Sequence, residues 1–440
     1  MTRYLFDNAT IVTLDPEDHI YDRGQLAIEG ETILSVGRAP DDFQPDERID
    51  LGGRVVMPGL YNAHTHAAMT FARGYAEDLP LERWFNERIW RLESALTPEI
   101  VYWGTALAAV EMIRGGIVGF GDMYFHMDQV ARVVEESGMR ATLAWTVFGQ
   151  GEEVGITVPE TVDFVHHHNG AAGGRLRALF GPHSPYMCPD AFLARTAAVA
   201  YREGIGIHIH VAETPEQVKL AWDQYDMSPV ELLGNRGLFE THTIVAHAIH
   251  VNEVDITTLA NKQVHVVQCP STYLRYAMGV APVPEMLARG VNVALGTDGA
   301  GSSVALNMWR EMRLAVLMQR QAHGDPTLMP GSLPLHMAAA NGARALGFPQ
   351  SGVLAPGNAA DLIVIDTTAP HFQPLHDVIA GLVWCTEPAD VRDVMVAGRW
   401  LMRDRNLLTL DEEAILSGFR EALSEMLGRP LGQFRTYDVG

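Results

Sequence analysis

The hydrophobic pattern over residues 1–56 is that of short strands. Brief apolar runs alternate with turns that contain Asp, Gly or Pro, which is typical of β-structure. The same pattern returns over residues 351–410. Because neither segment is long enough to bury a core alone, we predict that both pair into one small β-sandwich domain. The expected strands lie at 4–6, 9–12, 25–28, 360–365, 394–397 and 399–402.

The pattern between these segments, over residues 57–350, alternates short apolar runs with longer helical stretches. At least seven such repeats predict an α/β fold, a parallel (β/α)₈ TIM-like barrel that would carry the catalytic site. A C-terminal helix and tail are expected over 411–440. The expected barrel strands are 116–120, 140–146, 177–181, 206–211, 243–247, 264–268 and 291–296, and the expected helices are 98–114, 127–137, 190–203, 215–225, 282–289 and 305–322.

Composition narrows the class of protein. The 440-residue chain has 47% hydrophobic residues, and 32 Lys and Arg against 54 Asp and Glu give a net charge of −22. An acidic chain repels phosphate, so we expect neither nucleic acid nor a membrane surface as partner. The three cysteines, Cys188, Cys269 and Cys385, are too few for a disulfide framework. Without a signal peptide or a long apolar span, a cytoplasmic location is expected.

The strongest chemical signal is the sequence MPGLYNAHTH at residues 57–66. His64 and His66 are two residues apart, so on a strand both imidazoles lie on the same face. This spacing alone is weak evidence for a metal. The evidence for a metal is stronger because polar residues also lie at the ends of three further apolar runs. These are the carboxyl ends of predicted strands, where barrel enzymes place their active sites. These residues are His208, His210 and Glu213 after the first run, His247 after the second and Asp298 after the third.

Three neutral imidazoles and one carboxylate suit Zn²⁺ and also other divalent first-row metals. The competing interpretation is that the four polar strand ends are unrelated, but that interpretation does not predict that all four meet on one rim. Zinc-site sequences of the H-E-x-x-H and P-C-x-x-C types are absent.

With these residues the chain resembles the amidohydrolase superfamily, specifically its mononuclear deaminase branch. That branch includes S-adenosylhomocysteine/5′-methylthioadenosine deaminases, guanine and cytosine deaminases, and s-triazine hydrolases. The resemblance covers nearly the whole chain. Its further stretches are AEDL at 76–79, GPHSPY at 181–186, HVAET at 210–214, GTDG at 296–299 and GVLAPGNAADL at 352–362.

The resemblance implies His64, His66, His210 and Asp298 as ligands of one divalent metal, with Zn²⁺ expected and Fe²⁺ the alternative. It further implies Glu213 as the proton shuttle and His247 as the group that polarises the attacking water. His208 has a rival claim to ligation from its spacing. The family pattern places the ligand three residues before the glutamate, which selects His210.

The expected reaction follows from these roles. A bound metal lowers the pKa of its water toward ~7, Asp298 accepts a proton, and Glu213 protonates a ring nitrogen so that the amino group leaves as ammonia. We expect a hydrolytic deaminase acting on an amino-substituted heterocycle such as a purine, adenosine or methylthioadenosine. The alternatives are an s-triazine hydrolase that releases chloride or alkylamine, and a non-catalytic binding protein on the same scaffold. Homo-oligomerisation is compatible with the sequence.

The resemblance to the adenosylhomocysteine deaminases implies Trp84, Glu93 and His183 as substrate contacts. In that subfamily the matching glutamate holds the ribose hydroxyls and the matching histidine faces the purine. Each residue also has a plainer interpretation. Trp84 would be a core side chain, Glu93 an exposed helix carboxylate, and His183 a buried neighbour of the metal ligands. The run His166 to His168 is interpreted as a polar helix end or surface loop.

Trp145 is a departure from the subfamily. Members that bind a substrate carboxylate carry an arginine there, and the loop that follows in this chain adds Glu152 and Glu153 but no cation. Because a carboxylate needs a fixed cationic partner, the sequence predicts that Trp145 contacts neutral substrates. Arg275 would reverse this preference if it reached the site.

Overall fold

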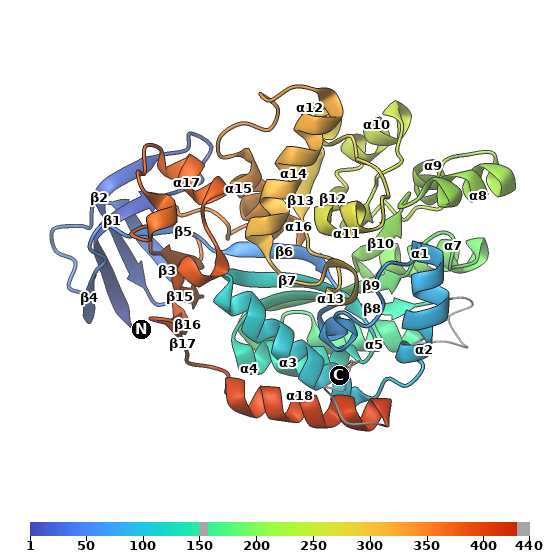
Figure 1. The fold of residues 1–440 in the computed structure, drawn as a ribbon, viewed down its shortest axis with the longest axis horizontal. Coiled ribbons are helices and arrows are strands. Elements are labelled where there is room, and N and C mark those ends of the chain that lie inside the picture. Colours follow the sequence, from blue (N-terminus) through green and yellow to red (C-terminus); the bar gives the residue numbers. More distant parts are fainter. Residues whose placement is uncertain (149–156, 429–440) are drawn as a thin grey trace, which may run out of the picture.

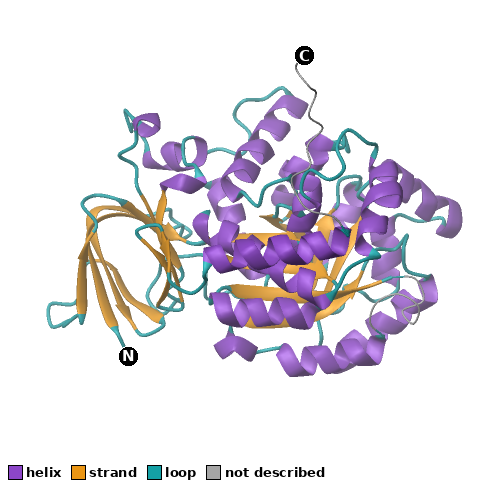
Figure 2. Ribbon diagram, turned by 60° about the horizontal axis from the view of Figure 1, so that its bottom comes forward, coloured by secondary structure: helices purple, strands orange, loops and turns teal. Residues whose placement is uncertain are grey.

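Two sheets organise the structure, a computed structural model that describes residues 1–148 and 157–428. One is an eight-stranded parallel sheet and the other a nine-stranded sheet that curls beside it (Figures 1 and 2). The predicted α/β barrel with an additional β domain is confirmed. The domain boundaries at residues 56, 350 and 410 stay predictions, and Glu152 and Glu153 lie outside the described residues.

The barrel strands follow one another around the sheet in chain order. They are β6 (Leu60–Thr65), β7 (Ile117–Tyr124), β8 (Arg140–Val147), β9 (Leu176–Pro182), β10 (Ile207–Val211), β11 (Thr243–His247), β12 (His265–Gln268) and β13 (Asn292–Leu295). The Asp298 amide donates to the His64 carbonyl at 3.0 Å. The Asn62 side chain exchanges hydrogen bonds of 2.7 and 2.8 Å with Thr297. These bonds join the first strand to the last, so the carboxyl ends form one rim.

Helices and short helical turns surround the barrel (Figure 2). Before β9 lie η1 (Ala67–Ala72), α1 (Leu81–Arg83), η2 (Trp84–Ile89), α2 (Trp90–Glu93), α3 (Pro98–Arg114), α4 (Met127–Ser137), α5 (Val158–His168) and α6 (Ala171–Gly174). Before β13 lie α7 (Asp190–Glu203), α8 (Pro215–Tyr225), α9 (Pro229–Asn235), α10 (Glu253–Asn261), α11 (Pro270–Arg275) and α12 (Val283–Ala288). After β13 lie α13 (Ala300–Ser303), α14 (Met308–His323), α15 (Leu333–Ala338) and α16 (Ala340–Ala345).

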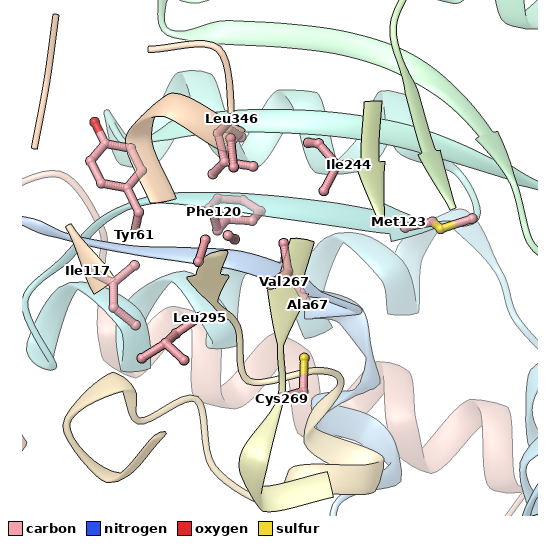
Figure 3. Close-up of a cluster of buried hydrophobic side chains, with 14 of the residues drawn as sticks. Tyr61, Ala67, Ile117, Phe120, Met123, Ile244, Val267, Cys269, Leu295 and Leu346 are labelled. Atoms are coloured by element: carbon pink, nitrogen blue, oxygen red, sulfur yellow. The ribbon is translucent and has the colours of Figure 1, made fainter. Parts of the chain in front are cut away.

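Apolar side chains fill the barrel because parallel strands covered by helices are buried on both faces. Figure 3 shows Phe120, Ile244, Val267 and Leu295 from four barrel strands in one buried cluster. Strand β7 extends to Tyr124, beyond the predicted end at residue 120. The pattern hid this extension because Asp122 is polar, yet Asp122 is fully buried and accepts a 2.6 Å hydrogen bond from the Ala67 amide.

The second sheet combines both ends of the chain. Its strands are β1 (Arg3–Val12), β2 (Ile20–Glu29), β3 (Thr32–Gly37), β4 (Glu47–Asp50), β5 (Val55–Pro58), β14 (Leu362–Ile365), β15 (Val391–Val396), β16 (Arg399–Arg403) and β17 (Asn406–Leu407). β5 pairs with both β1 and β14, so it joins the N-terminal strands to the C-terminal ones. η3 (Pro370–Phe372), α17 (Val378–Trp384) and η4 (Pro388–Asp390) lie between β14 and β15, and α18 (Glu412–Leu427) packs on α3. No helix within 1–148 or 157–428 has the length and hydropathy needed to span a membrane.

Candidate active site

The rim of the barrel brings together the four side chains that the sequence proposes as metal ligands. His64 and His66 come from β6 and its end, His210 lies on β10, and Asp298 follows β13. The ring centroid of His64 is 5.0 Å from that of His66 and 4.9 Å from that of His210. One Asp298 carboxylate oxygen, Oδ1, lies 3.2 Å from His66 Nε2 and 3.8 Å from His64 Nε2. All four groups therefore face one small volume.

Hydrogen bonds on the far side of the rings orient two of these imidazoles. His66 donates from Nδ1 to the Met123 carbonyl at 2.5 Å, and His210 donates from Nδ1 to the His183 carbonyl at 2.8 Å. A carbonyl only accepts, so each ring carries a hydrogen on Nδ1, and in its neutral form each ring keeps a lone pair on Nε2. Such hydrogen bonds are typical of metal-binding histidines, because they fix both the tautomer and the ring orientation.

A divalent metal ion fits this arrangement. His64 Nε2 is buried and has no hydrogen-bond partner among the described residues, which is costly unless something else binds it. One ligand atom each from His64, His66 and Asp298 lies within 4.8 Å of the others, and the same holds for His64, His210 and His247. Burial holds the pKa of His64 and of His210 well below the ordinary value, so both imidazoles are neutral and able to ligate.

The electrostatics of the site favour positive charge. Burial would raise the pKa of Asp298, but hydrogen bonding and attraction to His66 outweigh it and lower the pKa to about 2. Burial would likewise lower the pKa of His66, yet the Asp298 carboxylate raises it to about 9. The carboxylate thus stays ionised in a buried place and stabilises a cation beside it. A divalent ion would supply that charge.

Glu213 and His247 lie next to this cluster. Glu213 Oε1 is 3.6 Å from His247 Nε2. Its other carboxylate oxygen, Oε2, accepts hydrogen bonds from the Tyr186 hydroxyl at 3.3 Å and from Gln217 Nε2 at 3.2 Å. Both Glu213 and His247 are buried. The two partners on Oε2 hold the carboxylate so that Oε1 is directed toward His247.

The backbone is strained at three of the strand ends that carry the site. Ala212, His247 and Asp298 have φ angles of 50°, 76° and 62°, in the left-handed region that non-glycine residues rarely adopt. Each lies just after or at the end of a barrel strand. Strain of this kind persists where the surrounding structure holds it in place, and it is common at functional sites.

His183 and Glu93 lie beside the cluster. The His183 ring stacks on His210 and on Phe148, each with centroids 4.5 Å apart, and burial lowers its pKa to about 3. Glu93 accepts a 2.6 Å hydrogen bond from the Tyr124 hydroxyl. Burial raises the pKa of Glu93 to about 7.

Glu93 and Trp145 both line a cavity of about 1020 Å³, whose described lining includes none of the proposed metal ligands. The Trp145 ring meets Phe164 edge to face at 5.2 Å. Aromatic and acidic side chains dominate the lining, and none of its described residues is Lys or Arg. The described lining comprises Trp90, Glu93, Ser94, Leu96, Phe125, His126, Asp128, Trp145, Glu160, Asp163, Phe164, His167 and His168. The last two belong to the histidine run, which ends α5 as a polar helix end.

Trp84 and Arg275 lie outside this cavity. The Trp84 ring is buried and packs 5.5 Å from the ring of Tyr276. Arg275 donates to the Glu77 carboxylate and to the Ser302 carbonyl, so its charge already has partners.

Sequence reasoning missed four residues that contact the site: Tyr124, Phe148, Tyr186 and Gln217. Two of them left a signal. Gln217 is four residues after Glu213, and Tyr186 belongs to the stretch GPHSPY. The other two are aromatic residues at the ends of apolar strands, where their polar or stacking contacts are not visible in the pattern.

Comparison with known proteins identifies the family. The profile of the amidohydrolase family matches residues 55–401. The chain belongs to the amidohydrolase family. The match covers all eight barrel strands, the site side chains and, of the second sheet, β5, β14, β15 and part of β16. The family resemblance expected from the sequence is therefore confirmed. The site side chains covered are His64, His66, His210, Glu213, His247 and Asp298.

Several proteins similar to this chain are named deaminases. A 5-methylthioadenosine/S-adenosylhomocysteine deaminase from Pelotomaculum thermopropionicum is 45% identical over 98% of this chain and 100% of its own length. A 5′-deoxyadenosine deaminase from Methanosarcina acetivorans is 40% identical over 98% of this chain and 99% of its own. A solved adenosine deaminase from Xanthomonas campestris with bound zinc has a TM-score of 0.92 and 31% identity, and covers 97% of this chain and 99% of its own. The prediction that this chain is a hydrolytic deaminase is confirmed by these relatives.

Proposed function

We propose that this amidohydrolase deaminates adenine nucleosides whose 5′ substituent is small and uncharged, with 5′-methylthioadenosine, 5′-deoxyadenosine and adenosine as candidate substrates. The observation that carries the proposal is the convergence of three imidazoles and a carboxylate on one rim, beside the buried Glu213 and His247 pair. The names of the similar relatives support the substrate class.

The proposed metal ligands are His64, His66, His210 and Asp298. When bound, a divalent cation such as Zn²⁺ lowers the pKa of a water molecule to about 7 and so makes a nucleophile available at neutral pH. The buried His64 Nε2, which has no hydrogen-bond partner among the described residues, supports this assignment, as does the ionised carboxylate of Asp298. Fe²⁺ is the alternative, because the donor set suits both ions.

The chain's own residues would then move the protons. Asp298 accepts the proton of the attacking water. Glu213 donates to the ring nitrogen beside the reacting carbon, which makes that carbon electrophilic. His247 lies 3.6 Å from the Glu213 carboxylate and polarises the same water. Asp298 and Glu213 together return a proton to the amino group, since ammonia leaves readily and an amide ion does not.

Substrate selection is proposed to depend on Glu93, His183 and Trp145. Glu93 would hold the ribose hydroxyls, and His183, which is neutral and stacked beside His210, would face the purine. Trp145 and the acidic cavity lining favour an uncharged 5′ substituent, because a substrate carboxylate would lie near several acidic side chains and no described Lys or Arg of the lining. Trp84 is proposed to support the site through packing.

The test is an ammonia-release screen of the metal-loaded protein across adenosine, 5′-methylthioadenosine, 5′-deoxyadenosine, adenine, guanine, cytosine, a pterin and amino- and chloro-triazines. Ammonia from the adenine nucleosides is the expected result. Release of chloride or alkylamine from a triazine would support the s-triazine hydrolase alternative instead. A folded protein that takes up no metal and releases nothing would support a non-catalytic binding role.

A further inference from the structure

The His64 imidazole is oriented differently from the other two. His66 and His210 donate to backbone carbonyls, which fixes each ring in one tautomer. The partner of His64 is another imidazole, since His64 Nδ1 lies 2.9 Å from His208 Nε2. Imidazole nitrogens can donate or accept, so this hydrogen bond can run in either direction.

His208 reaches His64 across the barrel. It lies on β10, whereas His64 lies on β6, and three strands separate the two in the sheet. His208 precedes His210 by two residues and therefore shares its face of the strand, one layer deeper. The side chain is completely buried, and its Nδ1 has no hydrogen-bond partner among the described residues.

Two arrangements satisfy the bond, each with one hydrogen on each ring. In the first, His64 Nδ1–H donates to His208 Nε2, and His64 Nε2 keeps a lone pair on the side of Asp298. In the second, His208 Nε2–H donates to His64 Nδ1, and His64 carries its hydrogen on Nε2, 3.8 Å from Asp298 Oδ1. Only the first arrangement leaves His64 able to ligate a metal.

We propose that His208 is a positioning residue, which holds His64 in its metal-binding tautomer by accepting from Nδ1. The inference rests on the proposed metal site. Each arrangement leaves one buried N–H without a hydrogen-bond partner among the described residues, on His208 Nδ1 in the first and on His64 Nε2 in the second. Only in the second does that N–H lie close to a carboxylate, 3.8 Å from Asp298 Oδ1. The metal-free chain therefore prefers the second arrangement, and metal binding reverses the hydrogen bond. Without an acceptor at position 208, His64 Nδ1–H would itself be buried and unpaired in the metal-bound state.

The first test measures zinc affinity of the full-length chain by competition with a chromophoric chelator. His208→Leu removes the acceptor, whereas His208→Gln places an amide oxygen near the position of Nε2. Loss of such an outer hydrogen bond typically weakens metal binding about 10- to 100-fold. We expect that loss in His208→Leu and a change below about threefold in His208→Gln. The matched control is His265→Leu, because His265 is also a barrel-strand imidazole but its partner is Asn292.

Equal zinc affinity of wild type and His208→Leu would overturn the inference, and so would an equal loss in His208→Leu and His208→Gln. A wild-type chain that binds no zinc would contradict the proposed function instead, so the two failures are distinguishable.

The second test uses nitrogen NMR of ¹⁵N-histidine-labelled wild type, and it applies even if His208→Leu does not fold. With zinc, His208 should carry its hydrogen on Nδ1 and His64 should carry its hydrogen on Nδ1. Without metal, both hydrogens should move to Nε2. A hydrogen on His208 Nε2 with zinc bound would refute the proposed positioning role. The same tautomer of His208 in both states would refute the reversal of the hydrogen bond on metal binding.

Discussion

Two buried polar clusters, one at the rim of the barrel and one at its junction with the second sheet, differ in how completely their groups are paired. In the junction cluster, the Asp361 carboxylate accepts two hydrogen bonds from Arg140, at 2.6 and 3.0 Å, and others from Tyr61, Ser351 and the Ala397 amide at 3.2, 2.5 and 2.8 Å. In the rim cluster, His64 Nε2 and His247 Nδ1 have no hydrogen-bond partner among residues 1–148 and 157–428. The rim cluster consists of His64, His66, His210, His247 and Asp298.

From this difference we infer that the junction cluster stabilises the fold, whereas the rim cluster serves function. A buried polar group that is fully hydrogen-bonded rigidifies the fold, whereas one left unpaired costs free energy. The junction cluster therefore holds β8 of the barrel to the second sheet. The rim cluster retains groups without a hydrogen-bond partner among the described residues, and we propose that a metal and a substrate use them. Substitutions in the two clusters should accordingly affect different measurements.

The largest effect is expected from Asp298→Asn. The change removes a proposed metal ligand and the proposed acceptor of the water proton together, so kcat/KM for 5′-methylthioadenosine should fall by a factor on the order of 10⁴ or more. Metal analysis should show less than one ion per chain. Circular dichroism should report an unchanged fold, because the Asp361 hydrogen bonds of the junction remain. A variant with wild-type metal content and turnover would exclude both roles of Asp298.

Glu213→Gln should leave the metal in place and slow turnover. The amide keeps the shape of the side chain but cannot transfer a proton, so kcat should fall by a factor on the order of 10²–10⁴. The matched control is Glu216→Gln, an exposed acid on the neighbouring helix α8, which should retain nearly full activity. Near-normal kcat in Glu213→Gln would rule out the shuttle role.

Arg140→Met should act on stability. Removing one partner of a buried pair leaves the other charge uncompensated, so the free energy of unfolding should drop by about 3–5 kcal/mol. Urea unfolding measures this drop, and kcat of the folded fraction should stay close to wild type. The control is Arg403→Met, which breaks the half-exposed pair with Glu47 and should cost about 1 kcal/mol or less. If both variants lost the same free energy of unfolding, the buried pair of Arg140 and Asp361 would contribute no more to stability than the half-exposed pair of Arg403 and Glu47.

Trp145→Arg should have the smallest effect and should change specificity. In wild type, kcat/KM for 5′-methylthioadenosine should exceed that for S-adenosylhomocysteine by at least about tenfold, or ~1.4 kcal/mol. The new guanidinium should raise kcat/KM for the carboxylate substrate about tenfold. Arg275→Ala should leave the ratio unchanged, because Arg275 is held by Glu77 and Ser302. A wild type that prefers S-adenosylhomocysteine tenfold would contradict this interpretation.

Much of the barrel follows from the sequence because its strands are continuous apolar runs between amphipathic helices. α3, α4, α7 and α8 have the predicted bounds. β7 was predicted too short, since the buried Asp122 interrupts the apolar pattern and its hydrogen bond to the Ala67 amide joins segments far apart in sequence. The sequence contains no local sign of such a long-range bond.

The proposed metal ligands were more predictable from the sequence than the proposed substrate contacts, for a related reason. His64, His66, His210 and Asp298 each end a strand, and the ends of parallel strands must meet at one rim. Trp84 and Arg275 lie on short helical segments whose direction depends on packing, and the structure directs Trp84 toward Tyr276 and Arg275 toward Glu77. The His64 and His208 contact was also invisible, because it spans the barrel.

The most direct test of the account is a titration of metal-stripped protein with Zn²⁺, with ammonia release from 5′-methylthioadenosine measured at each step. The account predicts that activity is absent without metal, rises in proportion to added zinc and reaches its plateau at one ion per chain. A plateau at two ions per chain, or full activity in chelator-treated protein that contains no metal, would contradict a single metal centre at the rim.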